Sequence, residues 1–235
     1  MKPELVIALD EPSLERASAL VAKTRSRVTW YKVGYQAYYG YGERIIAQLR
    51  EAGKSLFLDL KLHDIPTTVA AGVRAAATTG ASLLTLHASG GRAMMEAAAK
   101  ARDEVSDKSR LRLLAVTVLT SMGSSDLREI GVDREPDALV PIRARLAASS
   151  GIDGVVCAVA EAQAVREATR KDFVVLCPGI RPAGASDGDQ RRVATPTDAA
   201  RAGSDFIVVG RPITQAADPG EAAYAITREI EGALA

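Results

Sequence analysis

Three charged residues stand together where an apolar segment of the sequence ends. The segment FLDLKLHDIPTT, residues 57–68, carries Asp59 and Lys61 two positions apart and Asp64 three positions later. Side chains alternate across a β-strand, so Asp59 and Lys61 point to the same side of it. A carboxylate and an ammonium placed in this way form either a structural ion pair or a pair that acts on a substrate.

Two further charges favour the second interpretation. Asp10 ends an earlier apolar segment, and Lys32 lies in the next one. A buried ion pair alone is weak evidence for stability, because desolvation of the charges can exceed their attraction. Four charges of alternating sign at the ends of neighbouring strands are difficult to explain by packing. We therefore interpret Asp10, Lys32, Asp59 and Lys61 as functional residues.

Short apolar segments recur along the chain and must position these charges. They are rich in Val, Ile and Leu, and near-continuous apolar runs of this length are typical of strands buried on both faces of a parallel sheet. The expected strands are 5–10, 30–34, 56–62, 83–87, 113–119, 154–158, 174–180 and 206–210.

Amphipathic helical patterns separate these strands. Segments 13–24, 42–53 and 160–170 carry apolar residues at three- and four-residue spacing, with charged residues on the opposite face. Gly53 and Gly80 stand where a helix would end, because glycine adopts the left-handed conformation of a helix C-cap without strain.

Two proline pairs mark further helix starts. Thr195 precedes Pro196 and Asp218 precedes Pro219, so each pair combines an N-cap residue with a proline at the first helical position. The second pair predicts a last helix near 219–233.

The alternation of strands and helices predicts an α/β fold, a (β/α)8 TIM barrel, with a doubly wound open sheet as the alternative. The chain has 235 residues and shows no composition break, linker or low-complexity segment. We therefore expect a single domain over residues 1–235.

Composition and charge exclude several classes of protein. The net charge of +1 gives no sign of a nucleic-acid-binding or membrane-binding surface. No apolar stretch approaches the ~18 residues of a membrane span, and no signal peptide precedes the first apolar run. Cys157 and Cys177 lie in apolar segments without a C-x-x-C spacing, so we expect buried thiols in a reducing compartment. The expected location is the cytoplasm.

Polar residues follow several of the expected strands. In a barrel of this type the active site lies at the carboxyl ends of the strands. Arg181 follows the seventh strand and opens the polar, Gly-rich segment 181–190, which has the composition of a mobile lid. Gly210 and Arg211 follow the eighth strand, where barrels commonly bind phosphate, so we expect Arg211 to contact a phosphate group.

Several common motifs are absent from the sequence. It contains no G-x-G-x-x-G after a strand, no G-x-x-x-x-G-K and no H-E-x-x-H. The histidines, His63 and His87, are poorly placed for a metal cluster. We expect structural roles for both, and no metal site.

The combination of these motifs resembles the orotidine 5′-monophosphate decarboxylase family, over essentially the whole chain. DLKLHDIPTT carries the family's D-x-K-x-x-D signature, which also occurs in a related group of sugar-phosphate decarboxylases. The matching stretches are ALD (8–10), KVG (32–34), HASGG (87–91), VTVLTS (116–121), CPGIRPAG (177–184), GDQRRVATP (188–196) and GRPIT (210–214). The combination of this signature with the last three stretches is specific to the orotidylate enzymes.

This resemblance implies a role for individual residues. Lys61 would be the proton donor, within a charged array that also contains Lys32, Asp59 and Asp64, and Asp64 would enter the site of a neighbouring subunit. Asp10 and Lys32 would hold the ribose hydroxyls. Thr120 would contact the pyrimidine, and Ile65 and Thr68 would belong to a wall of the site that is contributed across a dimer. The residues that would bind the phosphate are Arg181, Gln190, Gly210 and Arg211.

The implied reaction converts orotidine 5′-monophosphate to uridine 5′-monophosphate (UMP) and CO2 in pyrimidine biosynthesis, without a cofactor, in a homodimer with shared sites. Two alternatives remain open. A sugar-phosphate decarboxylase or epimerase would use D-x-K-x-x-D with a divalent metal, and would need a carboxylate near the position of Lys32. A catalytically silent nucleotide-binding barrel would bind the substrate without turnover.

Overall fold

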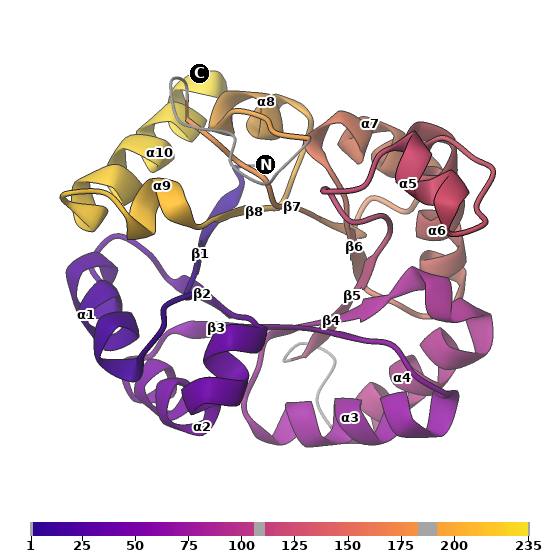
Figure 1. Cartoon of the computed structure of the whole chain (residues 1–235), viewed down its shortest axis with the longest axis horizontal. Helices are drawn as coiled ribbons and strands as arrows, with labels where there is room; N and C mark the ends of the chain where they lie inside the picture. Colours follow the sequence, from indigo (N-terminus) through magenta and orange to yellow (C-terminus); the bar gives the residue numbers. More distant parts are fainter. Residues whose placement is uncertain (1, 106–110, 183–191, 235) are drawn as a thin grey trace.

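The strands of the protein form one closed parallel barrel in which each strand pairs with the next along the chain and β8 pairs with β1 (Figure 1). The computed structural model describes residues 2–105, 111–182 and 192–234. Its strands are β1 (Glu4–Ala8), β2 (Trp30–Val33), β3 (Ser55–Leu62), β4 (Leu83–His87), β5 (Arg112–Val116), β6 (Gly154–Val156), β7 (Val174–Cys177) and β8 (Phe206–Val209).

Helices follow the strands and surround the barrel (Figure 1). In the described residues they are α1 (Leu14–Thr24), α2 (Tyr35–Glu51), α3 (Pro66–Thr78), α4 (Gly91–Val105), α5 (Ser124–Glu129), α6 (Pro136–Ser149), α7 (Val159–Ala168), α8 (Pro196–Arg201), α9 (Arg211–Thr214) and α10 (Pro219–Leu234), with a 3₁₀ turn at Ala88–Gly90.

The closure of the sheet confirms the predicted (β/α)8 barrel. β1 and β8 pair in parallel, with Val6 opposite Val208, so the alternative of an open, doubly wound sheet is wrong. The predicted helix starts are also confirmed. The hydroxyl of Thr195 accepts a 3.1 Å hydrogen bond from the backbone N–H of Asp198, and Asp218 accepts one of 3.0 Å from that of Glu221.

Several predicted boundaries differ from the structure. The first, sixth and seventh strands end at Ala8, Val156 and Cys177 rather than at residues 10, 158 and 180. The fifth strand ends at Val116 rather than at residue 119, because the hydroxyl and N–H of Thr117 both bind the carbonyl of Val156, at 2.8 and 3.1 Å, and Arg143 binds the carbonyl of Thr117. The helix expected from residue 42 begins at Tyr35 and kinks at Tyr41, where φ is −160°. Glycines in this segment obscured the helical pattern of its first two turns.

The interior of the barrel is filled by one apolar cluster to which all of the strands contribute. Val6 and Ala8 on β1 belong to it, whereas Leu5 and Ile7 pack towards the helices, as expected from alternation. Phe57 on β3 is also in the interior cluster. Asp59 has the same parity, so the alternation directs its side chain towards the mouth of the barrel. Cys157 and Cys177, as predicted, are buried.

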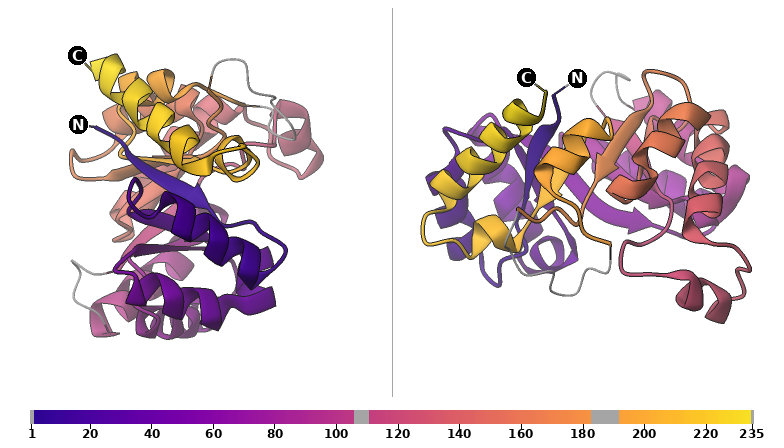
Figure 2. Two further views of the ribbon diagram at one scale, coloured as in Figure 1. Left: turned by 90° about the vertical axis from the view of Figure 1, so that its left-hand side faces the viewer. Right: turned by 90° about the horizontal axis from the view of Figure 1, so that it is seen from above.

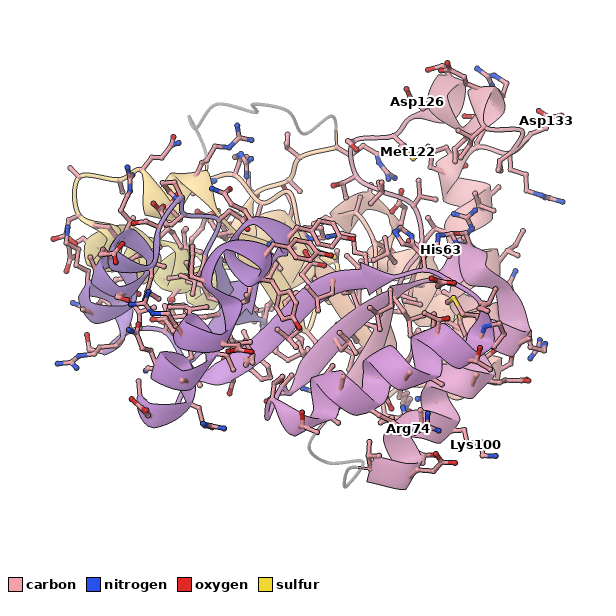
Figure 3. The ribbon with its side chains drawn as sticks, turned by 60° about the horizontal axis from the view of Figure 1, so that its bottom comes forward. His63, Arg74, Lys100, Met122, Asp126 and Asp133 are labelled. Carbon is pink, nitrogen blue, oxygen red and sulfur yellow. The ribbon has the colours of Figure 1, made fainter. Side chains whose placement is uncertain are left out.

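The two ends of the chain lie side by side (Figure 2), and the Lys2 ammonium forms a 2.7 Å ion pair with Glu231. Because the strands are parallel, their carboxyl ends gather at one end of the barrel. In Figure 3, His63 lies on the upper side of the barrel, whereas Arg74 and Lys100 lie at its lower end. Within the described ranges, no helix has the length and apolar character that crossing a membrane requires.

Candidate active site

A cavity of about 560 Å³ opens at the carboxyl ends of the strands. Apolar side chains from the barrel interior, among them Phe57, Val116 and Leu176, form its floor. The predicted site residues that line it are Asp10, Lys32, Asp59, Lys61, Thr120, Arg181, Gly210 and Arg211. The fold therefore brings together residues from one end of the chain to the other.

Four of these residues form a row of alternating charges. The carboxylate of Asp59 lies 2.8 Å from the Nζ of Lys61 and 3.5 Å from that of Lys32. The Nζ of Lys32 in turn lies 3.2 Å from a carboxylate oxygen of Asp10. Asp59 and Lys32 are largely buried, whereas half of the Asp10 side chain is exposed. The row thus runs from the rim of the cavity to its interior.

The neighbouring charges determine the ionisation of Asp59. Burial would raise the pKa of its carboxyl group, but the charges of Lys32 and Lys61, with hydrogen bonds from Lys61 and Thr85, hold that pKa below its ordinary value. Asp59 is therefore a carboxylate in the neutral range, in contact with the ammonium groups of both lysines.

Gly34 lets the backbone pass close to this row. A Cβ atom at this position would lie 3.0 Å from the Nζ of Lys32 and 3.1 Å from a carboxylate oxygen of Asp10. Both distances are tighter than ordinary van der Waals contact, so a larger residue would have to displace one of the two charged groups. The close approach of Lys32 and Asp10 thus explains why a glycine occupies the last position of the KVG stretch.

An irregularity in β3 determines where Lys61 lies. Leu58 pairs with Leu84 and Leu62 pairs with Leu86, so four residues of β3 advance while β4 advances two. Within this irregularity Lys61 adopts φ +44°, the one positive φ of a non-glycine residue in the described part of the chain. Bulges of this kind redirect side chains next to active sites.

Thr85 and Tyr35 are contacts that the sequence analysis missed. The buried hydroxyl of Thr85 accepts a 2.9 Å hydrogen bond from the N–H of Lys61 and donates one of 3.0 Å to Asp59. The hydroxyl of Tyr35 donates a 3.0 Å bond to the carbonyl of Leu60. The presence of a polar residue inside the apolar segment LLTLH could have indicated a role for Thr85, whereas nothing in the sequence indicated one for Tyr35.

The opposite side of the cavity carries the residues assigned to phosphate. The Arg181 side chain is buried, and its backbone N–H donates a 2.9 Å hydrogen bond to the carbonyl of Ala194. Arg211 is the first residue of the short helix α9, and Gly210 precedes it. Gln190 and residues 183–189 of the expected lid lie outside the described residues.

Three predicted site residues do not line this cavity. Asp64 and Thr68 line a second hollow of about 720 Å³, which lies around the loop after β3 and also includes Lys61 and Tyr39. Ile65 between them is 64% exposed. In a single chain, therefore, these three residues do not join the charged row.

The two histidines lie together beside that second hollow. Their rings are 5.2 Å apart, and His87 is the more enclosed of the two. Burial, the nearby His63, and the charges of Lys61 and Arg143 lower the pKa of His87 to about 4, so it is neutral at pH 7. No group of three or more metal-ligating side chains occurs among the residues that the structure describes.

Comparison with known proteins agrees with this geometry. The model of the Orotidine 5′-phosphate decarboxylase / HUMPS family matches residues 3–226. The chain is 49% identical over 229 residues to the orotidine 5′-phosphate decarboxylase of Methylobacterium sp. (strain 4-46), covering 97% of this chain and 96% of the relative. It is 46% identical over 237 residues to that of Photobacterium profundum, with 100% of both chains covered.

A solved structure shares the fold. The crystal structure of orotidine 5′-phosphate decarboxylase from Lactobacillus acidophilus superposes with a TM-score of 0.85 at 37% identity, over 98% of this chain and 99% of that chain. The barrel, the charged row at its mouth and these likenesses lead to one conclusion: the chain belongs to the orotidine 5′-phosphate decarboxylase / HUMPS family.

Proposed function

We propose that this protein decarboxylates orotidine 5′-monophosphate to UMP and CO2, as a carboxy-lyase of pyrimidine biosynthesis. The observation that carries the proposal is the carboxylate of Asp59, held between the ammonium groups of Lys61 and Lys32 at 2.8 and 3.5 Å in the cavity at the barrel mouth. The curated relatives that the chain matches over nearly its whole length have this activity in their names.

The difficult step of this reaction is the carbanion left at C6 of the pyrimidine when CO2 departs. In our proposal the ammonium of Lys61 lies beside C6, stabilises the developing negative charge, and donates its proton to that carbon. Charged groups fixed in advance in a partly dry site are effective in such a role, because they need no reorganisation when the charge appears. No cofactor takes part in the step.

Asp59 and Lys32 have supporting roles in this mechanism. Asp59 directs the Lys61 ammonium, since its own carboxylate is ionised and in contact with it. Lys32 faces the same carboxylate oxygen of Asp59 as Lys61 does, at 3.5 Å, and with Asp10 it holds the ribose hydroxyls. The substrate carboxylate approaches this row as a second negative charge, and its loss as CO2 removes the repulsion.

The remaining contacts position the substrate. Thr120, buried in the loop after β5, is assigned to the pyrimidine ring. Arg181, Gln190, Gly210 and Arg211 are assigned to the phosphate. A phosphate far from the reacting carbon contributes binding energy that can organise the site, so its loss should reduce turnover as well as affinity.

We further propose that the protein acts in the cytoplasm as a homodimer with shared sites. Asp64, Ile65 and Thr68 stand outside the cavity of their own chain, and Ile65 is an exposed apolar residue. Tyr39, beside the same hollow, is 80% exposed. Exposed apolar side chains that cluster in this way are typical of an interaction surface, and a two-fold dimer would bring each copy of Asp64 to the other's cavity.

One assay tests the proposed activity. Orotidine 5′-monophosphate is followed spectrophotometrically in the presence and absence of EDTA. Turnover that is the same in both arms supports the proposal. Loss of turnover with EDTA would favour the metal-dependent sugar-phosphate enzymes, and binding without turnover would favour the silent barrel.

A further inference from the structure

We infer that Thr85 and Tyr35 are positioning residues that hold the peptide group between Leu60 and Lys61 and thereby direct the Lys61 ammonium. This inference deepens the proposed function and rests on it for the role of Lys61. The two side chains come from different elements, β4 and α2, and neither is in the set of residues assigned to the substrate.

The geometry of one peptide group carries the inference. Its carbonyl oxygen, that of Leu60, accepts a 3.0 Å hydrogen bond from the hydroxyl of Tyr35. Its N–H, that of Lys61, donates a 2.9 Å bond to the hydroxyl of Thr85. Both polar groups of this peptide therefore bind side-chain hydroxyls, at the point where the pairing of β3 with β4 is irregular.

The conformation of Lys61 explains why the peptide needs to be held. Lys61 has φ +44°, a left-handed conformation that is unfavourable for a residue with a Cβ atom. Such a conformation persists only when surrounding contacts determine it. If the peptide relaxed to an extended conformation, the Lys61 side chain would turn away from its present position. The two hydroxyls thus oppose a relaxation that would misdirect the ammonium.

Thr85 also fixes the partner of the lysine. Its hydroxyl donates a 3.0 Å hydrogen bond to one oxygen of Asp59, whose other oxygen contacts Lys61. Thr85 has no exposed surface, so no water molecule of the bulk solvent can replace it. One buried hydroxyl therefore links the backbone of Lys61 to the carboxylate that faces its side chain.

The ring of Tyr35 contributes a second contact. The Nζ of Lys61 lies 5.5 Å from the centroid of this ring, within the range of a cation–π interaction. The phenylalanine variant would retain the ring and lose only the hydroxyl. Tyr35→Phe therefore separates the bond to the peptide from the contact with the ammonium.

The first experiment measures kcat and KM of Thr85→Val, Thr85→Ser and Tyr35→Phe. Thr85→Val keeps the shape and removes the hydroxyl, so kcat should fall by about tenfold to a hundredfold with a KM within about threefold of wild type. Thr85→Ser restores the hydroxyl and should recover most of the kcat. Thr24→Val is the matched control, since Thr24 is also fully buried and its hydroxyl bonds Tyr31 at 2.8 Å.

Two results of this experiment would overturn the inference. One is a folded Thr85→Val with a kcat within about twofold of that of Thr24→Val. The other applies if Thr85→Val does not fold. Tyr35→Phe, which removes a more exposed hydroxyl, then provides the test, and a wild-type kcat in Tyr35→Phe would contradict the inference. Because both hydroxyls bind one peptide, the two substitutions combined should lower kcat by less than the product of the single effects.

A second experiment does not require turnover. The hydrogen bond from Thr85 lowers the pKa of Asp59, which is also faced by Lys32 from β2, by Lys61 on its own strand and by Tyr35 from α2. In Thr85→Val the pKa of Asp59 should rise, visible by carboxyl ¹³C NMR, and the acid limb of kcat/KM should move to higher pH. An unchanged carboxyl titration would overturn the inference. Inactivity of the wild type would instead refute the proposed function.

Discussion

The ammonium of Lys61 lies 2.8 Å from the carboxylate of Asp59, its neighbour two positions back on the same strand. The Asp59 side chain is only 14% exposed. Removal of Lys61 would leave the poorly hydrated Asp59 carboxylate with Lys32 beside it, whereas removal of Asp59 would leave the Lys61 ammonium without its carboxylate partner. Lys32 at 3.5 Å provides partial compensation when Lys61 is removed. The consequences of altering the two positions are therefore unequal, which makes substitution of Lys61 the cleaner test.

Lys61→Ala should abolish decarboxylation while the protein remains folded, because the proton donor and the positive charge assigned to the C6 carbanion are both lost. Turnover and circular dichroism are measured together. Lys100→Ala is the matched control, since Lys100 is exposed and lies at the opposite end of the barrel (Figure 3). Near-normal turnover in Lys61→Ala would show that another group protonates C6.

Arg211→Ala should weaken substrate binding by roughly 1.5–3 kcal/mol and also slow turnover, because a charged hydrogen bond to the phosphate is lost. Arg74→Ala, which alters an exposed arginine at the other end of the barrel, should change neither. Phosphite dianion added to orotidine, the substrate without its phosphate, should raise its slow turnover. If phosphite has no effect, phosphate binding is not coupled to catalysis in this protein.

Mixing two inactive variants, Lys61→Ala and Asp64→Ala, should restore activity when their subunits exchange. In a heterodimer with shared sites, one site carries both defects and the other carries neither. Random mixing gives about half heterodimers with one intact site each, so activity should recover to roughly a quarter of wild type. Mass spectrometry verifies the exchange. Exchange without recovery would place Asp64 in the site of its own chain.

Gly34→Ala should weaken substrate binding more than it lowers kcat. The added methyl group would lie 3.0 Å from the Nζ of Lys32, and this flexible group must move away from Asp10, which is assigned with it to the ribose. Gly40→Ala in the same helical segment is the control, because a Cβ atom there meets nothing within 4 Å. Equal KM values for the two variants would indicate that the Lys32–Asp10 pair does not bind substrate.

The stability of the protein should fall as the pH decreases from 6.5 towards 4, in part because of His87. Its pKa is about 4 in the folded state and 6.5 ordinarily, so in this window the unfolded chain binds a proton that the folded protein does not. The contribution is at most about 1.4 kcal/mol for each pH unit.

Urea unfolding of wild type and His87→Asn at pH 7.5 and pH 5 measures this contribution. The variant should lose less stability than the wild type between the two pH values, because the titrating group is gone. The chain has only two histidines, so NMR of the ring protons can follow the pKa of His87 directly. A midpoint near 6.5 for His87 would contradict the prediction.

The strands, the closed barrel and the charged row were predictable from the sequence because each depends on a local pattern. Apolar segments alternating with amphipathic helices indicate parallel strands, and equal parity places Asp59 and Lys61 on one side of β3. The parallel arrangement then gathers the strand ends, so Asp10 and Lys32 could be assigned to the same cavity without knowledge of any distance.

The irregularity in β3 could not be predicted in the same way. No glycine marks it, and the positive φ of Lys61 depends on contacts with Thr85 and Tyr35, which are distant in the sequence. The early start of α2 was hidden for a related reason, since glycines weaken a helical pattern that tertiary packing supports. In our proposal the position of Asp64 in an active site depends on a second chain, which no pattern within one sequence specifies.

The adjacency of the two ends of the chain has a consequence for protein engineering. The side chains of Lys2 and Glu231 form an ion pair, so a short linker could join the ends of the chain. The chain could be reopened at the exposed turn of Gly53, where a Cβ atom would meet nothing within 4 Å. Such a circular permutant would keep every strand neighbour in the ring. Asp59 would then be made near the start of synthesis and Lys32 near its end, so their ion pair would join residues that are far apart in the sequence instead of on consecutive strands.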